Sequence, residues 1–252
     1  MLTCLSKPTS GEAFVSGHST ASESAQVKRI VGISPQDTAV AGNLTVRENL
    51  RLIAGIYGFS RERTAQRIDD MTRLFRLEEV LDSRAKTLSG GWKRKLSIAM
   101  ALISEPEVLF LDEPTLGLDV LARRELWSAV KSLRGKITII LTTHYMEEAA
   151  NADYVVILDK GSIAAEGTPF ELKNKYVQDT MSIYGVTEAQ IKTLGIEYEE
   201  IRDGYRVRVK NTSEATELIA AHQELFHDYE VTKGGMDDVF LAVTGKRLGG
   251  EN

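Results

Sequence analysis

Two adjacent carboxylates, Asp112 and Glu113, are the side chains of this sequence that most directly suggest chemistry. They follow a short apolar run at residues 108–111, which is typical of a strand buried on both faces of a parallel sheet. In open α/β sheets, ligands bind beyond the carboxyl ends of the strands. A carboxylate pair at that position can hold a hard cation such as Mg²⁺ and polarise a water molecule. Taken alone, the pair is as consistent with a turn or a helix cap.

A second candidate group, Ser89, Gly90 and Gly91, precedes a predicted helix at about residues 92–104. Glycines let backbone N–H groups come close to a ligand, and a helix N-terminus attracts anions. The first turn of this helix carries three consecutive cations at residues 93–95, where the helix dipole disfavours positive charge. Either a bound polyphosphate offsets this cost, or the three cations form a solvated turn.

These pieces resemble the motifs of ABC transporter ATPases. Residues 88–92 (Leu-Ser-Gly-Gly-Trp) resemble the signature motif, residues 110–113 the Walker B strand, and residues 116–119 the D-loop. The order is that of the family, and so is the spacing of 112 − 89 = 23 residues between the signature serine and the Walker B aspartate. Trp92 departs from the pattern, because the family most often has glutamine there, although related drug-exporter ATPases vary at this position.

Two further residues match the family once spacing is considered. Gln36 follows a strand predicted at residues 27–33 and matches the Q-loop glutamine. His144 directly follows a strand predicted at residues 136–143 and matches the H-loop histidine, 144 − 112 = 32 residues after the Walker B aspartate. A lone glutamine or histidine after a strand would otherwise be interpreted as a turn or capping residue.

The resemblance implies a catalytic and metal-binding role for four of these residues. Asp112 would hold Mg²⁺, and Gln36 would join the site of Mg²⁺ and water to the transporter-facing subdomain. Glu113 would polarise the attacking water, and His144 would bind the γ-phosphate of ATP. The cofactors that the resemblance implies are therefore ATP and Mg²⁺.

The resemblance also implies partners. ATP would lie between two head-to-tail ATPase subunits, so that Ser89, Gly90 and Gly91 reach across to the nucleotide of the second subunit. Asp119 would line the contact between the subunits. Hydrolysis would drive membrane-spanning permease subunits to export a drug-like or antibiotic solute, as in exporters of the daunorubicin-resistance type.

The family's phosphate-binding loop, the Walker A pattern G-x-x-x-x-G-K-[ST], is missing from this sequence. Gly-Lys occurs only at residues 135–136 and 245–246, and neither pair has the first glycine or the following Ser or Thr. Backbone N–H groups of that loop cradle phosphates, and its lysine reaches the β- and γ-oxygens. We therefore expect the chain to be N-terminally truncated relative to the family, and to be a poor ATPase alone.

Two alternative functions stay open. The first is a degenerate, non-hydrolysing half that lends its signature motif to the ATP of a partner ATPase; the presence of Asp112, Glu113 and His144 argues against it. The second is a soluble ABC ATPase acting on DNA or ribosomes. The formal charge of 31 − 36 = −5 and the pI near 5.5 argue against a nucleic-acid partner.

Positioning these residues requires a parallel sheet whose strands end at one edge. The fold class expected is α/β: a P-loop NTPase-like ABC ATPase core with a mostly parallel sheet, lacking its first strand and P-loop. The core would span residues 1–177, with a helical subdomain at about residues 37–105. Residues 178–252 would form a small α+β accessory domain, because short strand patterns there alternate with helical ones and Asp203-Gly204 signals a hairpin.

Composition limits the compartment. The single cysteine, Cys4, rules out an internal disulfide framework and suits a reducing cytosol. No apolar run approaches the roughly 18 residues of a membrane span, and the N-terminal residues lack the pattern of a signal peptide. With the resemblance, this predicts a cytoplasmic chain that is peripheral on the inner face of the cell membrane through the permease.

Overall fold

The structure, a computed structural model, describes residues 1–245, which fall into two compact units divided between Thr143 and His144. The first unit contains a three-stranded parallel sheet of order β3-β4-β5, and its strands are β3 (Val31–Ser34), β4 (Val108–Asp112) and β5 (Thr138–Thr142). All three end at the same edge, as expected for a parallel sheet. The buried strand predicted at residues 108–111 is confirmed.

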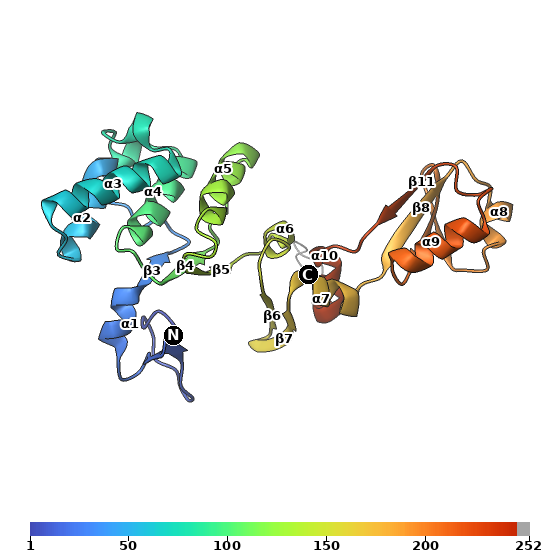
Figure 1. Ribbon diagram of the computed structural model, residues 1–252, viewed down its shortest axis with the longest axis horizontal. Coiled ribbons are helices and arrows are strands. Elements are labelled where there is room, and N and C mark those ends of the chain that lie inside the picture. Colours follow the sequence, from blue (N-terminus) through green and yellow to red (C-terminus); the bar gives the residue numbers. More distant parts are fainter. Residues whose placement is uncertain (246–252) are drawn as a thin grey trace. The chain divides into compact units, whose positions relative to one another are not determined.

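Helices gather on one side of this sheet (Figure 1). They are α2 (Val46–Ile56), α3 (Arg61–Phe75), α4 (Gly90–Leu102) and α5 (Val120–Lys131). Their apolar sides share one hydrophobic core with the inner face of the sheet. Thr45 and Glu48 form a reciprocal capping box that starts α2. The two short 3₁₀ turns that lead from α3 towards α4 are Glu78–Val80 and Ala85–Thr87.

Helix α4 lies very close to strand β3, and two small residues of β3 explain why. A Cβ atom added at Gly32 would lie 2.3 Å from the carbonyl oxygen of Ala101, so only glycine allows this approach. Two residues further along, the buried Ser34 hydroxyl is hydrogen-bonded to the Ser97 hydroxyl of α4 at 3.0 Å. The helix that begins at the candidate signature motif is therefore fixed to the strand that leads to Gln36.

The strand predicted at residues 27–33 is wrong over its first half, because residues 24–30 form helix α1 (Ser24–Ile30). The Glu23 carboxylate before this helix accepts hydrogen bonds from the Ser19 N–H at 3.0 Å and from His18. Within the helix only Val27 is buried, while the basic residues of its last turn are exposed. A strand buried on both faces would have had to bury one of those cations. The small hairpin before α1 pairs β1 (Phe14–Val15) with β2 (His18–Ser19).

In the second unit, β6 (Val155–Asp159) and β7 (Ser162–Gly167) form an antiparallel hairpin. Three helices pack with it around one apolar cluster: α6 (Met146–Ala149), α7 (Pro169–Tyr176) and α10 (Met236–Thr244). The last helix along the chain therefore packs against elements that precede residue 178. The boundary predicted at residues 177/178 stays a prediction.

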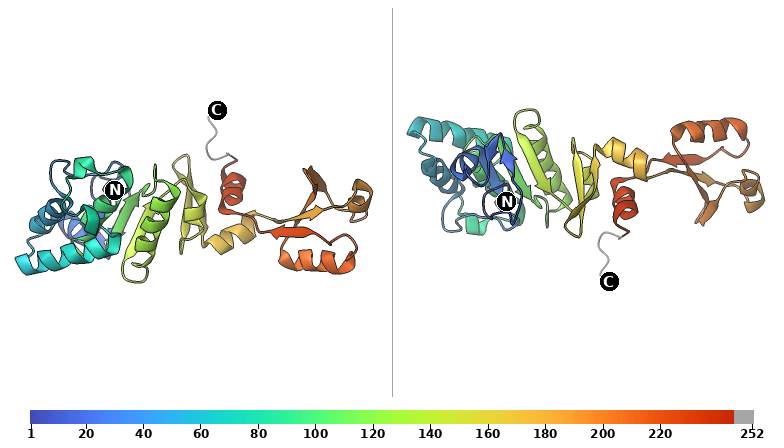
Figure 2. Two further views of the ribbon diagram at one scale, coloured as in Figure 1. Left: turned by 90° about the horizontal axis from the view of Figure 1, so that it is seen from above. Right: turned by 90° about the horizontal axis from the view of Figure 1, so that it is seen from below.

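The remainder of the second unit is an antiparallel sheet of order β11-β8-β10-β9 with two helices (Figure 2). In chain order the elements are β8 (Asp179–Tyr184), α8 (Glu188–Lys192), β9 (Tyr198–Ile201), β10 (Gly204–Val209), α9 (Thr212–Ala221) and β11 (Tyr229–Thr232). This is a β-α-β-β-α-β arrangement. The α+β expectation is confirmed, and the hairpin signalled by Asp203-Gly204 joins β9 to β10.

Candidate functional site

The carboxyl ends of β3, β4 and β5 bring part of the predicted site together. Ser34 pairs with Leu111, and Asp112 pairs with Thr142, so the three strands end at nearly the same level. Gln36 lies two residues beyond the end of β3, and Glu113 lies one residue beyond the end of β4. The structure therefore places Gln36, Asp112 and Glu113 at one edge of the sheet, where ligands of open α/β sheets bind.

Thr142 organises the acidic pair, and sequence reasoning missed it. Its hydroxyl donates to Asp112 Oδ1 at 2.5 Å and accepts from the Glu113 N–H at 3.1 Å. One side chain at the end of β5 thus fixes both the Asp112 carboxylate and the backbone that follows it. A polar residue at the next-to-last position of the strand predicted at residues 136–143 was the only sequence signal.

Glu113 adopts a left-handed backbone conformation, with φ at +44°. This conformation costs a residue with a side chain about 1–3 kcal/mol, and it persists only where the surroundings enforce it. The hydrogen bond from the Glu113 N–H to Thr142 is one such constraint. Strain of this kind clusters at active sites, and here it falls on the residue with the predicted catalytic role.

The donor set at this edge fits Mg²⁺. The Asp112 carboxylate is exposed, and the hydroxyl bond occupies only one of its two oxygens. Gln36, also exposed, offers an amide oxygen, and both are the hard ligands that Mg²⁺ prefers. Within residues 1–245 no group of three or more His, Cys, Asp or Glu side chains is placed to hold a metal. A cation here would therefore rely on waters and phosphate oxygens for its other ligands.

Arg94 corrects the interpretation of the basic turn. Its guanidinium, with the residue only 5% exposed, donates to the carbonyl oxygens of Pro35 at 2.7 Å and Gln36 at 2.5 Å. Burial lowers the pKa of Arg94, and the negative charges of Asp112 and Asp37 oppose that shift. Arg94 is neither solvated nor free to bind a polyphosphate; it joins helix α4 to the segment that carries Gln36.

Lys95 is also buried, so the solvated-turn interpretation is wrong for it as well. Its ammonium donates to Glu125 Oε2 of α5 at 2.5 Å and lies 4.5 Å from the centre of the Trp92 ring. The hydrogen bond from Lys95 lowers the pKa of Glu125. Trp92, the departure from the family pattern, thus covers a buried cation by a cation–π contact. Lys93 is half-buried.

The signature residues form an exposed helix N-terminus. Helix α4 begins at Gly90, and Ser89 before it makes no side-chain capping bond. Both residues are exposed, so the first N–H groups of a 13-residue helix face solvent. Gly91 lies against α5, because a Cβ atom there would be 3.3 Å from the Cβ of Ala122.

Asp119 caps helix α5. Its Oδ1 accepts hydrogen bonds from the N–H groups of Leu121 and Ala122, both at 2.9 Å. The two apolar residues that follow it are strongly exposed, Val120 at 76% and Leu121 at 67%. The carboxylate assigned to a subunit contact thus has a structural role within its own chain and adjoins an uncovered apolar surface.

His144 is the one predicted site residue in the second unit, two residues after the end of β5. Its side chain is exposed, and its ring stacks at a tilt on Tyr145 with 4.2 Å between centroids. Its role at the γ-phosphate stays a prediction.

Comparison with known proteins decides the family. The family described as "ABC transporter" matches residues 1–116. The Nod factor export ATP-binding protein I of Cupriavidus metallidurans is 34% identical over 264 residues, covering 98% of this chain and 84% of the relative. The chain belongs to the ABC transporter family of ATPases. Members of this family bind and hydrolyse ATP.

Other relatives of this ABC ATPase differ in length. A daunorubicin resistance ATP-binding protein of Streptomyces coeruleorubidus is 34% identical over 258 residues, covering 97% of this chain and 82% of the relative. The human phospholipid-transporting ATPase ABCA3 is 41% identical over 177 residues, or 70% of this chain. The chain spans only 10% of that protein's length.

Solved structures of ABC ATPases share the fold. An ATP-binding subunit of an ABC transporter matches with a TM-score of 0.62 and 32% identity, covering 69% of this chain and 74% of the other. A dimeric ATP-binding cassette in a post-hydrolysis state, bound to ADP and phosphate, matches with a TM-score of 0.60 and 26% identity over 66% and 76% of the two chains. In residues 1–245, none of the helices has the length and apolar character needed to cross a membrane.

Proposed function

We propose that this ABC ATPase chain binds and hydrolyses ATP to drive export of a drug-like or antibiotic solute through separate membrane-spanning subunits. The observation that carries the proposal is the acidic pair at the end of β4, where Thr142 fixes Asp112 and the backbone of Glu113. Relatives that cover most of the chain are named for Nod factor export and daunorubicin resistance, which supports an exporter.

In this proposal the sheet edge performs phosphoryl transfer to water. Asp112 and Gln36 would hold Mg²⁺, which would neutralise charge on the terminal phosphates. Glu113 would orient and polarise the attacking water, and His144 would bind the γ-phosphate. Phosphoryl transfer depends above all on positioning and charge neutralisation. The hydrogen-bonded Asp112 carboxylate and the fixed backbone of Glu113 are suited to provide them.

A second ATPase subunit, placed head to tail, would complete the site. The exposed N-terminus of α4 at Ser89, Gly90 and Gly91 offers N–H groups to the phosphates of the partner's ATP. The exposed Val120 and Leu121 beside Asp119 form an apolar surface that suits a subunit contact. A related cassette was solved as a dimer with ADP and phosphate bound, which supports this arrangement.

The test is ATP-driven transport by the full chain. The chain, its permease and a second ATPase subunit would be reconstituted in vesicles with a fluorescent anthracycline as the probe. We expect ATP to drive accumulation of the probe, and Glu113→Gln to abolish it. Accumulation that is independent of ATP, or unaffected by Glu113→Gln, would refute the proposal.

A second function is favoured by one observation: the helix N-terminus at the signature motif is exposed. The chain would then lend Ser89, Gly90 and Gly91 to the ATP of an intact partner and would turn over little ATP alone. Mixing it with such a partner separates the two functions. Ser89→Arg would abolish turnover in both cases, whereas turnover that survives Glu113→Gln would identify the lending half.

A further inference from the structure

A cavity of about 410 Å³ lies between helices α3, α4 and α5 of the first unit. Four cationic side chains line it, and Glu125 is its only acidic one; the cations are Arg73, Arg76, Lys95 and Arg124. Ser128 of α5 and Ser132, which directly follows that helix, add hydroxyl groups to the lining. A partly open cavity with this excess of positive charge favours an anion.

Two of these cations lack an acidic partner. Lys95 is paired with Glu125 at 2.5 Å, whereas Arg76 and Arg124 form no ion pair among residues 1–245. The charge of Arg76 is close enough to Glu125 to contribute to lowering the pKa of that carboxyl. Guanidinium groups present several N–H donors in a rigid fork that matches phosphate oxygens. The cavity therefore holds unused donors for a phosphate group.

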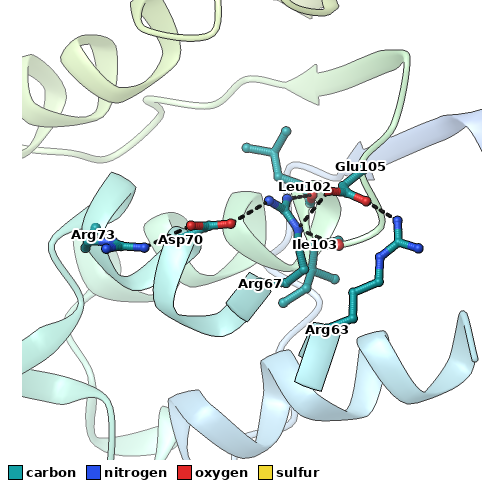
Figure 3. Close-up of polar contacts among 7 residues, drawn as sticks. All are labelled: Arg63, Arg67, Asp70, Arg73, Leu102, Ile103 and Glu105. Carbon is teal, nitrogen blue, oxygen red and sulfur yellow. Dashed lines mark hydrogen bonds and ion pairs between the residues drawn. The ribbon is translucent and has the colours of Figure 1, made fainter. Parts of the chain in front are cut away.

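The fourth cation, Arg73, ends a chain of ion pairs that carries more positive than negative charge (Figure 3). Asp70 accepts from Arg73 at 3.0 Å and from Arg67 at 3.2 Å, so one carboxylate serves two guanidinium groups. At the other end Glu105 pairs with Arg67 and Arg63. Three arginines share two carboxylates, so the positive charge of Arg73 at the cavity is only partly balanced.

We propose that this cavity binds a phosphate-bearing ligand, either a soluble phosphate or pyrophosphate or the phosphate of a lipid headgroup. Arg76 and Arg124 would donate directly to the phosphate oxygens, with Arg73 adding positive charge at the opening. At the wall, Lys95 would be shared between the ligand and Glu125. Lys95 lies on α4, the helix that begins at the signature motif. A bound phosphate would therefore contact that helix directly. The site differs from the proposed nucleotide site in every residue.

Titration of inorganic pyrophosphate into the full chain at low ionic strength, followed by calorimetry, tests this proposal. We expect saturable binding, and about tenfold weaker binding for Arg124→Gln and for Arg76→Gln, as for the loss of one charge-assisted hydrogen bond. Arg61→Gln, at the opposite end of α3 from Arg73 and also exposed, is the matched control and should leave affinity unchanged. No saturable binding, or equal weakening by Arg61→Gln, would overturn the proposal.

Glu125→Gln distinguishes ligand binding from a structural role. Removal of this carboxylate frees Lys95 for the anion, so pyrophosphate should bind several-fold more tightly and should raise the melting temperature more than in the parent chain. Unchanged or weaker binding by folded protein would contradict the site. So would binding that is lost in Ser89→Ala but kept in Arg124→Gln, because the anion would then lie at the signature motif.

Vesicles identify the source of the phosphate. Binding to phosphatidic acid vesicles but not to phosphatidylcholine vesicles, competed by pyrophosphate and lost in Arg124→Gln, would assign a lipid headgroup. Pyrophosphate binding with no vesicle binding would assign a soluble phosphate. Both results support the site. Vesicle binding that Arg124→Gln leaves intact, in a chain that does not bind pyrophosphate, would overturn it.

Discussion

Arg94 connects two motifs through a pair of hydrogen bonds to main-chain carbonyl groups. One side chain of α4 holds Pro35 and Gln36, the residues that follow β3. Each hydrogen bond from a charged donor contributes about 1.5–3 kcal/mol. The position of Gln36 at the sheet edge therefore depends on a residue in the helix that begins at the signature motif.

Replacement of Arg94 should be costly for this reason. We expect Arg94→Leu to lower the free energy of unfolding by about 2–4 kcal/mol, because two carbonyl groups lose their donors. The free energy of unfolding of Arg94→Lys should lie between those of the parent chain and Arg94→Leu, because an ammonium group cannot reproduce the paired donors of the guanidinium. Urea unfolding measures both. Arg51→Leu, at an exposed position of α2, is the control, and equal stability of Arg94→Leu and Arg51→Leu would disprove the role of Arg94.

The left-handed conformation of Glu113 gives a second prediction at this scale. Glycine adopts a φ of +44° without strain, so Glu113→Gly should be more stable than Glu113→Ala by about 1 kcal/mol. Both variants should lack hydrolytic activity, because neither carries a carboxylate. Thermal unfolding of the two variants side by side makes the comparison. An alanine variant as stable as the glycine variant would mean that this backbone is unstrained.

Helices α4 and α5 are joined by the ion pair between Lys95 and Glu125, and the pH dependence of stability should report it. The hydrogen bond from Lys95 lowers the pKa of Glu125 below its usual 4.5. A lowered pKa in the folded state adds stability above the unfolded-state value, and this stability is lost as the pH falls through the folded-state value. Parent protein should therefore lose stability below about pH 4.5 more steeply than Glu125→Gln. Chemical unfolding at a series of pH values measures this difference. If the stability of the parent and of Glu125→Gln changed equally with pH, the ion pair would contribute nothing to stability.

Elements with a strong local signal could be predicted from the sequence. The apolar run at residues 108–111 identified β4, and Asp203-Gly204 identified the hairpin of β9 and β10. Residues 27–30 were wrongly predicted as a strand. The Glu23 carboxylate before α1 accepts hydrogen bonds from His18 and from the Ser19 N–H, and the spacing of apolar residues does not reveal such contacts. β11 has a single half-buried apolar residue, Val231, and so lacked a strand pattern.

The candidate site likewise contains residues that the sequence predicts and residues that only the structure shows. Asp112 and Glu113 were predictable because an acidic pair after a buried strand is a local pattern. Thr142 and Arg94 were not, because each acts through a partner distant in sequence: Thr142 bonds to a residue 30 positions away, and Arg94 to residues 58 and 59 positions away. Only tertiary structure shows that these side chains have roles at the site.

On the scale of the whole molecule, the last helix joins parts of the second unit that are distant in sequence. Met236 of α10 is 2% exposed and lies in one apolar cluster with Met146 and Leu172. We expect Met236→Ala to lower the free energy of unfolding by about 2–4 kcal/mol, the usual cost of removing a buried methionine side chain. Leu241→Ala, at a position that is 40% exposed on the same helix, should cost less than about 1 kcal/mol. Equal effects of the two changes would show that α10 contributes no buried contact.

The central claim is that this chain hydrolyses ATP at the edge formed by Gln36, Asp112 and Glu113. The measurement that tests it most directly is the steady-state rate of ATP hydrolysis by the full chain assembled with its permease and a second ATPase subunit. Glu113→Gln should reduce this rate by about a hundredfold or more, as expected for loss of a general base. Glu107→Gln, an exposed residue just before the other end of β4, should leave it unchanged. Equal rates for parent and Glu113→Gln protein, in preparations free of other ATPases, would contradict the account.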